Sequence, residues 1–435
     1  MSCRSSMGLV SRPPQSRSSC KRAKRHHSLH TMPGPMEGLL SHDRLRAARA
    51  HIERSDEATL GRQAALSAIP APTGAEGARG ARVAEMLDEA GLENVTIDDV
   101  GNVRGWYRNV AGTQHAAPLP DGSVVLSAHL DTVFGPELDV SVARRGPRLE
   151  GPGIADNARG LAALVAIGGA LVRARVETRR PVLFAATVGE EGSGDLRGVR
   201  HLLENPARPH AFIALDGAGI ERIVHRALGC RRYHIAFHGP GGHSWAAFGV
   251  ANPANAVGRA VALLADPPAH RAPRTTCAVV RLGGGTSLNS IPQTAWFEVD
   301  LRSEDPRALE KLDRAVQAIL TQALDEENRH RVPGTVPLTI DVRRVGDRPS
   351  GLTPRAHPLV QAAVAATRAV GHDHQLACAS TDANVPIALG VPAVALGAGG
   401  RAGDAHLPTE WYENDKGALG IVRALLVTAA MAEAQ

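Results

Sequence analysis

Aromatic residues, cysteines and long apolar runs are scarce in this 435-residue chain, and each shortage narrows what the protein can be. Phe, Trp and Tyr together make up 3% of the residues. No run of eighteen apolar residues occurs, so no membrane span is expected. The five cysteines are scattered and show no C-x-x-C spacing. This pattern argues against a disulfide framework or a cysteine zinc site and favours a reducing compartment, the cytoplasm.

The positive net charge comes from the first residues of the chain. Residues 1–35 hold seven basic residues and no acidic one. Removing their charge of +7 from the net charge of +5 leaves the other 400 residues at about −2. The remainder of the chain is therefore slightly acidic and offers no nucleic-acid footprint.

Residues 1–36 are rich in Ser, Arg, Pro and His and have no hydrophobic periodicity. They lack the apolar core of a secretory signal. We expect a disordered basic tail or a start assigned too far upstream, with Met32 and Met36 as later candidates. A transit peptide and a nucleic-acid-binding arm are the alternatives. Fold predictions therefore begin at residue 37.

The length predicts two domains, and the first half alternates strands with helices. Residues 42–68 and 81–92 are predicted as helices, and 95–107 as a hairpin that turns at Gly101-Asn102. Short, continuously apolar strands are typical of a parallel sheet covered on both faces. Such strands are predicted over residues 123–130, 181–189 and 211–217. A long Ala-rich helix is predicted over residues 160–176. The pattern predicts an α/β domain with a mainly parallel sheet.

A different order of elements follows between residues 229 and 346. It is strand, helix, strand, strand, helix, strand, which is a ferredoxin-like unit. Helix, strand and helix then return to the end of the chain. The smaller domain is therefore predicted as an insertion that divides the larger one into residues 37–228 and 347–435.

Acidic and histidine residues stand just past the ends of the apolar strands or beside glycine-rich turns. Open α/β sheets bind ligands at that edge, and a metal ion would satisfy all these groups at once. Taken singly, each has an ordinary alternative: a hydrogen-bonded His–Asp pair, a helix N-cap, an acidic turn or a loop histidine. The set comprises His129, Asp131, Asp156, Glu190, Glu191, Asp216 and His406.

Glu190 and Glu191 are the most specific local signal. Two adjacent carboxylates after a buried strand repel each other, and no structural role requires them. One can bind a metal while its neighbour serves as a base. Asp156 as a bidentate carboxylate could bridge two cations. The alternative is a solvated acidic turn.

Several motifs of the chain resemble one family, in the family's order. The chain resembles the zinc-dependent exopeptidases and deacylases that include peptidase T, acetylornithine deacetylase, succinyl-diaminopimelate desuccinylase, carnosinase and aminoacylase. The resemblance spans roughly residues 60–425. The motifs are "IPAPTGAEG", "GNV", "AHLDT", "GPGIADNARG", "GEEGSGD", "ALDG", "GPGGHS", "NSIPQTAWFEVDLRS" and "AHLPTEW".

The resemblance implies a role for each residue of the set. His129 and Asp216 should hold one zinc ion, and Glu191 and His406 the other. Asp156 should bridge both ions and precede a cis peptide bond. Asp131 should orient His129, and Glu190 should be the general base. Mn²⁺ and Co²⁺ suit the same ligands.

The resemblance also implies roles for the inserted domain, as a lid or dimerisation domain. His243 should reach a neighbouring active site in a homodimer and bind the developing oxyanion. Asn289 and Arg302 should grip a substrate carboxylate. "GDRPSG", "STDANVP" and "GAGGRAGDAH" look most like peptidase T, which makes Arg348 and Asn384 candidate substrate-binding residues.

The leading hypothesis is a cytoplasmic dinuclear zinc exopeptidase for small peptides. A second keeps the site and makes the protein an N-acyl-amino-acid deacylase. A third, a module that residues 1–36 direct to nucleic acid or an anionic surface, conflicts with the slight acidity of the remainder.

Overall fold

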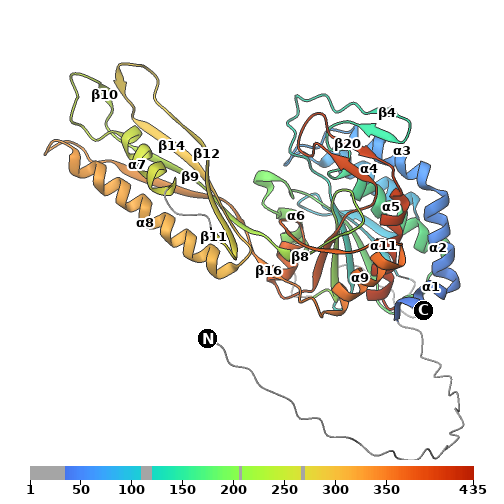
Figure 1. Cartoon of the computed structure of the whole chain (residues 1–435). Coiled ribbons are helices and arrows are strands. Elements are labelled where there is room, and N and C mark those ends of the chain that lie inside the picture. Colours follow the sequence, from blue (N-terminus) through green and yellow to red (C-terminus); the bar gives the residue numbers. More distant parts are fainter. Residues whose placement is uncertain (1–34, 109–119, 205–207, 266–269) are drawn as a thin grey trace, which may run out of the picture.

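The structure is a computed structural model that describes residues 35–108, 120–204, 208–265 and 270–435. A large unit with helices on both faces of a sheet stands beside a smaller, elongated unit (Figure 1). Nearly all of the basic segment 1–36 lies outside the described residues, so its expected nature stays a prediction.

Nine strands form the central sheet of the large unit, in the order β1-β2-β6-β3-β7-β18-β8-β16, with β17 paired to β8. β3 is parallel to β6 and β7, and β18 is parallel to β7, so the middle of the sheet is parallel, as predicted. The strands are β1 (Glu93–Ile97), β2 (Val103–Tyr107), β3 (Val124–His129), β6 (Val182–Thr187), β7 (Ala211–Leu215), β8 (Arg222–Ala227), β16 (Gly351–Leu352), β17 (Gln375–Ala379) and β18 (Ala393–Leu396).

The helices of the large unit cover both faces of this sheet. On one face α4, α5, α9 and α11 pack against the sheet, with α2 lying outside α5 and α11, and on the other face α6 and α10 pack against it. The helices are α1 (Pro35–Ser41), α2 (Asp43–Arg54), α3 (Asp56–Ser67), α4 (Gly77–Glu89), α5 (Ala158–Ala174), α6 (Arg197–Leu202), α9 (Pro358–Ala369), α10 (Asn384–Ala388) and α11 (Gly417–Met431).

The helix predicted over residues 42–68 is in fact two helices, because α2 and α3 are separated at Ser55. The Ser55 hydroxyl donates to the His51 carbonyl at the end of α2. Asp56 and Glu57 then begin α3, where acidic residues favour a helix N-terminus. The predicted hairpin is present as β1 and β2, whose strands flank Gly101 and Asn102.

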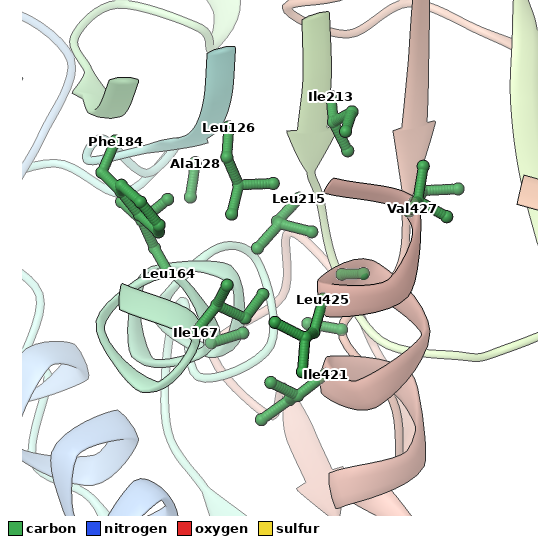
Figure 2. Close-up of a cluster of buried hydrophobic side chains, with 14 of the residues drawn as sticks. Leu126, Ala128, Leu164, Ile167, Phe184, Ile213, Leu215, Ile421, Leu425 and Val427 are labelled. Atoms are coloured by element: carbon green, nitrogen blue, oxygen red, sulfur yellow. The ribbon is translucent and has the colours of Figure 1, made fainter. Parts of the chain in front are cut away.

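Burial explains the continuous apolar runs. Every residue of β3, β6 and β7 is buried, since helices lie on both faces. Figure 2 shows side chains of α5 and α11 packed against those of the strands. The labelled residues of this core are Leu126, Ala128, Leu164, Ile167, Phe184, Ile213, Leu215, Ile421, Leu425 and Val427.

The long elements of the small unit follow the predicted strand-helix-strand-strand-helix-strand order, and three two-residue strands are present in addition. Its sheet is antiparallel, in the order β11-β12-β14-β9-β15, and α7 and α8 pack on one face. Burial alternates along β14, so every second side chain points to the opposite face. The elements are β9 (Gly229–His238), β10 (Gly242–His243), α7 (Pro253–Ala265), β11 (His270–Arg271), β12 (Arg274–Gly284), β13 (Ser290–Ile291), β14 (Thr294–Ser303), α8 (Pro306–His330) and β15 (Thr339–Arg348).

Two neighbouring strands connect the units. β9 begins at Gly229, just after β8, and β15 ends at Arg348, just before β16. The two strands pair with each other from end to end. The small unit therefore projects from the large one on a single two-stranded ribbon (Figure 1).

A separate four-stranded sheet lies at the upper side of the large unit in Figure 1. Its order is β19-β20-β5-β4, which joins β4 (Ala143–Arg145) and β5 (Arg148–Glu150) to β19 (Arg401–Gly403) and β20 (Trp411–Glu413). This pairing brings the segment before α5 close to the loop that carries His406. Among the described residues, no helix is long and apolar enough to cross a membrane.

Candidate metal centre

The ends of three parallel strands deliver the first candidate residues to one edge of the sheet. His129 is the last residue of β3, and Asp216 directly follows β7. Glu190 follows β6 after a tight turn at Gly189, where a positive φ of 64° favours glycine. Because these strands are neighbours and parallel, their carboxyl ends meet.

His129 is buried and lies between two aspartates. Its Nε2 is 3.0 Å from Oδ1 of Asp156, and its Nδ1 is 3.6 Å from Oδ1 of Asp131 and 3.0 Å from the Asp131 carbonyl oxygen. Burial opposes the charged imidazole, but the two carboxylates prevail and raise the pKa of His129 well above its usual value. Positive charge is therefore favoured at the point where Nε2 of His129 faces the Asp156 carboxylate.

Asp131 organises the Glu190-Glu191 turn. Its Oδ1 accepts a hydrogen bond from the backbone nitrogen of Glu190 at 2.9 Å, and its Oδ2 accepts one from that of Glu191 at 2.8 Å. Thr73 donates its hydroxyl to Oδ2 at 2.8 Å. Burial opposes ionisation, but the contacts with His129 outweigh it and lower the pKa of Asp131 to about 2. Asp131 therefore binds the loop behind the site as an anion.

Asp156 precedes α5 but does not cap it. The N-cap is Asn157, whose side chain accepts a hydrogen bond from Gly160, and the bond between Asp156 and Asn157 is cis. The Asp156 carboxylate is left free to face two histidines, with Oδ1 toward His129 and Oδ2 at 3.3 Å from Nε2 of His406. The N-cap alternative for Asp156 is thereby removed.

His406 reaches the same point from the loop between β19 and β20. Its φ of 67° is left-handed, and its Nε2 lies 3.1 Å from Oε1 of Glu191. Hydrogen bonds with Asp156 and Glu191 raise the pKa of His406 to about 10. A residue late in the sequence thus contacts carboxylates from the first half of the chain.

Asp216 completes the acidic side of the site. It borders a cavity of about 260 Å³ together with Asp156, Glu190, Glu191 and His406. Burial, with a further contribution from the Asp156 carboxylate, raises the pKa of Asp216 to about 7. Crowded carboxylates of this kind repel one another unless a cation lies between them.

The donor set fits a metal ion. One ligand atom each from His129, Asp156 and Glu191 lies within 4.8 Å of the others. Imidazole nitrogens and carboxylate oxygens are the ligands that zinc takes in catalytic sites. The structure therefore contains a candidate metal site, and Asp216 and His406 border it.

Glu190 turns away from this cluster toward Arg348. Nη1 of Arg348 lies 3.1 Å from Oε1 of Glu190, and Nη2 donates to the Glu190 carbonyl oxygen. Both side chains are buried. Burial raises the pKa of Glu190 well above its usual value, and the guanidinium opposes this. Arg348, expected to bind substrate, borders the cavity but is engaged with Glu190.

The remaining candidate residues are dispersed. Arg302 borders the cavity, with its Nη2 at 2.8 Å from Oδ2 of Asp300. His243 and Asn289 lie at the far tip of the small unit, where β10 pairs with β13 (Figure 1). Both are exposed and neither borders this cavity.

Asn384 is placed differently from the expectation that it binds substrate. It is fully buried, and its amide nitrogen donates to the carbonyl oxygens of Leu228 and Pro349. Its Oδ1 accepts from the backbone nitrogen of Thr381. The amide therefore joins the loops where the two units meet and does not face the cavity.

Sequence reasoning missed Glu410. This buried carboxylate accepts hydrogen bonds from the backbone nitrogens of Gly153, Ala155 and Asp156, at 3.1, 2.8 and 2.9 Å. It stands four residues after His406, inside the "AHLPTEW" motif. An acid so close to a candidate ligand in a glycine-rich loop was the available signal.

The clustered ligands lie at the carboxyl edge of a parallel sheet, and the family to which the chain belongs is one of metal-dependent hydrolases. Residues 125–432 match the model of peptidase family M20/M25/M40, so the chain belongs to this family. The suspected family and the expected fold class are thereby confirmed. None of the curated proteins matches the chain.

Solved structures share this fold. A tripeptidase from Staphylococcus aureus is 19% identical with a TM-score of 0.68, and aminopeptidase PepT from Bacillus cereus is 20% identical with a TM-score of 0.66. Each match covers 86% of this chain and 98% of the other. The YxeP protein from Bacillus subtilis, described as a dinuclear metal-binding peptidase, is 16% identical over 88% of this chain and 98% of its own, with a TM-score of 0.61.

Proposed function

We propose that the protein is a dinuclear zinc metallopeptidase that hydrolyses amide bonds of small peptides, as an aminopeptidase or dipeptidase. The observation that carries this proposal is the position of Glu190. It borders the same cavity as the clustered ligands but is held by an arginine and lies outside the cluster. The site therefore offers a separate base beside a place for cations.

The proposed ligand assignment follows the positions of the side chains. His129 and Asp216 would hold one zinc ion, Glu191 and His406 the other, and Asp156 would serve both because its two oxygens face different histidines. When bound, two such ions lower the pKa of water and polarise the scissile carbonyl. Manganese or cobalt could replace zinc with these ligands.

Glu190 would take a proton from the attacking water and pass it to the leaving amine. Its carboxylate is oriented by Arg348, and its backbone nitrogen is fixed by Asp131. Burial raises its pKa, which favours proton transfer near neutral pH. Asp131 would also fix the orientation of His129, as a carboxylate behind a metal-binding imidazole commonly does.

The small unit, residues 229–346, would act as a lid and dimerisation domain. β9 spans ten residues, about 30 Å, which separates the tip with His243 and Asn289 from the cavity of the same chain. Trp245 and Phe248 are 86% and 85% exposed beside His243. Large exposed apolar side chains commonly mark an interface. A homodimer would bring His243 and Asn289 to the partner's cavity.

Within one chain, Arg302 already borders the cavity from the lid, as Arg232 does. Arg302 would bind the carboxylate at the end of the substrate, because its planar guanidinium can donate two parallel hydrogen bonds. The alternative function, an N-acyl-amino-acid deacylase, uses the same residues. We place the enzyme in the cytoplasm because its scattered cysteines suit a reducing compartment.

A substrate panel run with metal analysis tests the proposal. Purified protein is assayed on dipeptides, tripeptides and N-acetyl and N-succinyl amino acids, with and without chelator. We expect peptides with a free amine to be preferred and chelator to abolish hydrolysis. Glu190→Ala should lose about 10²–10⁴-fold in kcat. Activity that resists the chelator would exclude the metal mechanism, and full activity of Glu190→Ala would exclude the base.

Light scattering, combined with kinetic assays, tests the proposed role of the small unit as a lid and dimerisation domain. We expect a dimer, and His243→Ala should be nearly inactive while remaining dimeric. Mixing His243→Ala with Glu190→Ala should restore part of the activity, because one of the two sites in a mixed dimer would be intact. A fully active monomer would contradict the role of His243 in trans.

A further inference from the structure

Four arginines line the cavity together with the acidic residues. Arg302 and Arg232 come from the open face of the lid sheet, Arg348 from the end of β15, and Arg222 from β8 in the large unit. The strand register explains the lid residues. Arg302 and Arg348 both lie opposite Cys230, one on each side of β9. Residues opposite one another on neighbouring strands share a face.

These arginines differ in what they contact within the described chain. Arg348 is paired with Glu190, and Arg302 with Asp300. Arg232 donates to the Gly192 carbonyl at 2.8 Å, with Asp300 at 3.8 Å from its Nε. These three therefore already have anionic or carbonyl partners.

Arg222 differs from the other three arginines because it has no acidic partner among the described residues. It is exposed, and among the described residues no carboxylate lies within ion-pairing distance of it. Its hydrogen bond to the Cys378 carbonyl is long, at 3.5 Å. Its sequence neighbour Glu221 is engaged with His372, at 2.9 Å. Apart from this one long contact, the Arg222 guanidinium has no hydrogen-bond or ion-pair partner among the described residues, and it borders the cavity.

The charge of the cavity also favours anions. Its four carboxylates, Asp156, Glu190, Glu191 and Asp216, face four guanidinium groups and the imidazole of His406. Two divalent cations held by those carboxylates would leave a surplus of positive charge. A substrate whose single terminal carboxylate is bound by Arg302 would neutralise only part of this surplus positive charge.

We propose that Arg222 forms a second anion subsite and that the preferred substrates are small peptides with an acidic side chain, Asp or Glu, in addition to the terminal carboxylate. This inference rests on the proposed peptidase function and narrows its substrate class. Arg222 is then a specificity-determining residue, because a guanidinium binds a carboxylate through charge-assisted hydrogen bonds that an amide does not match. The lid supplies one carboxylate site and the large unit supplies the other.

The test compares isosteric peptides. Ala-Glu and Glu-Ala are assayed against Ala-Gln and Gln-Ala with the zinc-loaded wild type, Arg222→Leu and Arg226→Leu. Arg226 is the matched control, because it lies on β8 but does not border the cavity. In at least one pair we expect kcat/KM of the wild type to favour Glu over Gln by about 10–100-fold. Arg222→Leu should remove most of that ratio, and Arg226→Leu should keep it.

Equal cleavage of Glu and Gln peptides, or an unchanged ratio in Arg222→Leu, would overturn the subsite. If no peptide is cleaved, the proposed peptidase function is wrong. Ligand binding then tests the anion subsite independently of activity. Glutarate is then titrated into the zinc-loaded proteins by calorimetry. Binding that weakens about 10-fold or more in Arg222→Leu, but not in Arg226→Leu, supports the subsite. Equal binding by all three proteins refutes it.

Discussion

Arg348 and Glu190 form a buried ion pair that spans the junction between the two units. Arg348 is the last residue of β15, and Glu190 lies in the turn after β6, with 3.1 Å between Nη1 and Oε1. The relative exposures of their side chains are 5% and 6%. Arg348, the last residue of the two-stranded ribbon that carries the lid, therefore also contacts the proposed base, Glu190.

Arg348→Leu should destabilise the protein strongly. Removing one partner of a buried pair leaves an uncompensated charge, which typically costs about 3–5 kcal/mol. The free energy of unfolding from urea titration measures this. Arg343→Leu is the matched control on the same strand, since Arg343 is exposed and should change stability by less than about 0.5 kcal/mol. Equal stability of the two variants would show that the pair contributes nothing.

Glu410→Ala should weaken metal binding while His406 and Asp156 remain present. Three backbone nitrogens of the segment that ends at Asp156 lose their acceptor. Residues that orient a ligand typically change metal affinity by about 10–100-fold. Competition with a fluorescent zinc chelator measures the affinity.

Two further variants sharpen this prediction. Glu410→Gln keeps one oxygen acceptor and should have intermediate affinity. Glu413→Ala, three residues on, removes only an ion pair with Arg401 and should bind zinc as the wild type does. If Glu410→Ala binds zinc normally, the carboxylate does not position the metal segment.

Asp382 should make the metal-free protein less stable as pH rises from about 4 to 6. Burial raises the pKa of Asp382 to about 6 from its ordinary value of 3.8, and its only described hydrogen bond is from Thr187. The folded state then binds more protons than the unfolded state between these pH values, so stability falls as the proton is lost. Asp382→Asn should remove this loss.

Urea unfolding at pH 4, 5, 6 and 7, with chelator present, tests this. The stability of Asp382→Asn relative to the wild type should rise by at most about 3 kcal/mol from pH 4 to pH 7. Asp373→Asn, an exposed acid, should run parallel to the wild type. A constant difference between Asp382→Asn and the wild type would contradict a buried carboxylate that ionises in this range.

Removing metal should lower the melting temperature. The carboxylates of Asp156, Glu191 and Asp216 lie around one cavity and repel one another without cations. Zinc at 100–1,000 times its Kd should stabilise the fold by about 3–4 kcal/mol. Circular dichroism melts of chelated protein, with zinc restored and with magnesium as control, measure this. Identical melts for chelated and zinc-loaded protein would exclude a zinc site linked to folding.

The sequence predicted the fold class well because buried parallel strands leave a plain signal. The apolar run ending at His129 and the run before Asp216 both place their polar residues at the carboxyl edge. His406 is different, because it comes from a loop whose position depends on pairing between β20 and β5. Its glycine-rich loop marked it as a candidate, and the family resemblance, not periodicity, assigned it as a metal ligand.

Contacts that depend on the direction of a side chain could not be predicted. Asn384 and Arg348 lie in motifs that suggested substrate binding, yet one joins backbone loops and the other holds Glu190. Arg222 carries no motif at all, and its place at the cavity follows from the antiparallel pairing of β8 with β18. Such tertiary pairings decide the direction a side chain faces.

Glu410 and His406 also have a consequence for how the protein is made. Asp156 and Glu191 are synthesised long before the loop that carries Glu410 and His406, and chains fold from the N-terminus as they emerge. A nascent chain that stops before this loop would hold the early acids without their late partners. The candidate ligands and the carboxylate that positions them therefore come together only after the loop with His406 and Glu410 has been synthesised, so a product truncated before this loop would lack part of the proposed metal site.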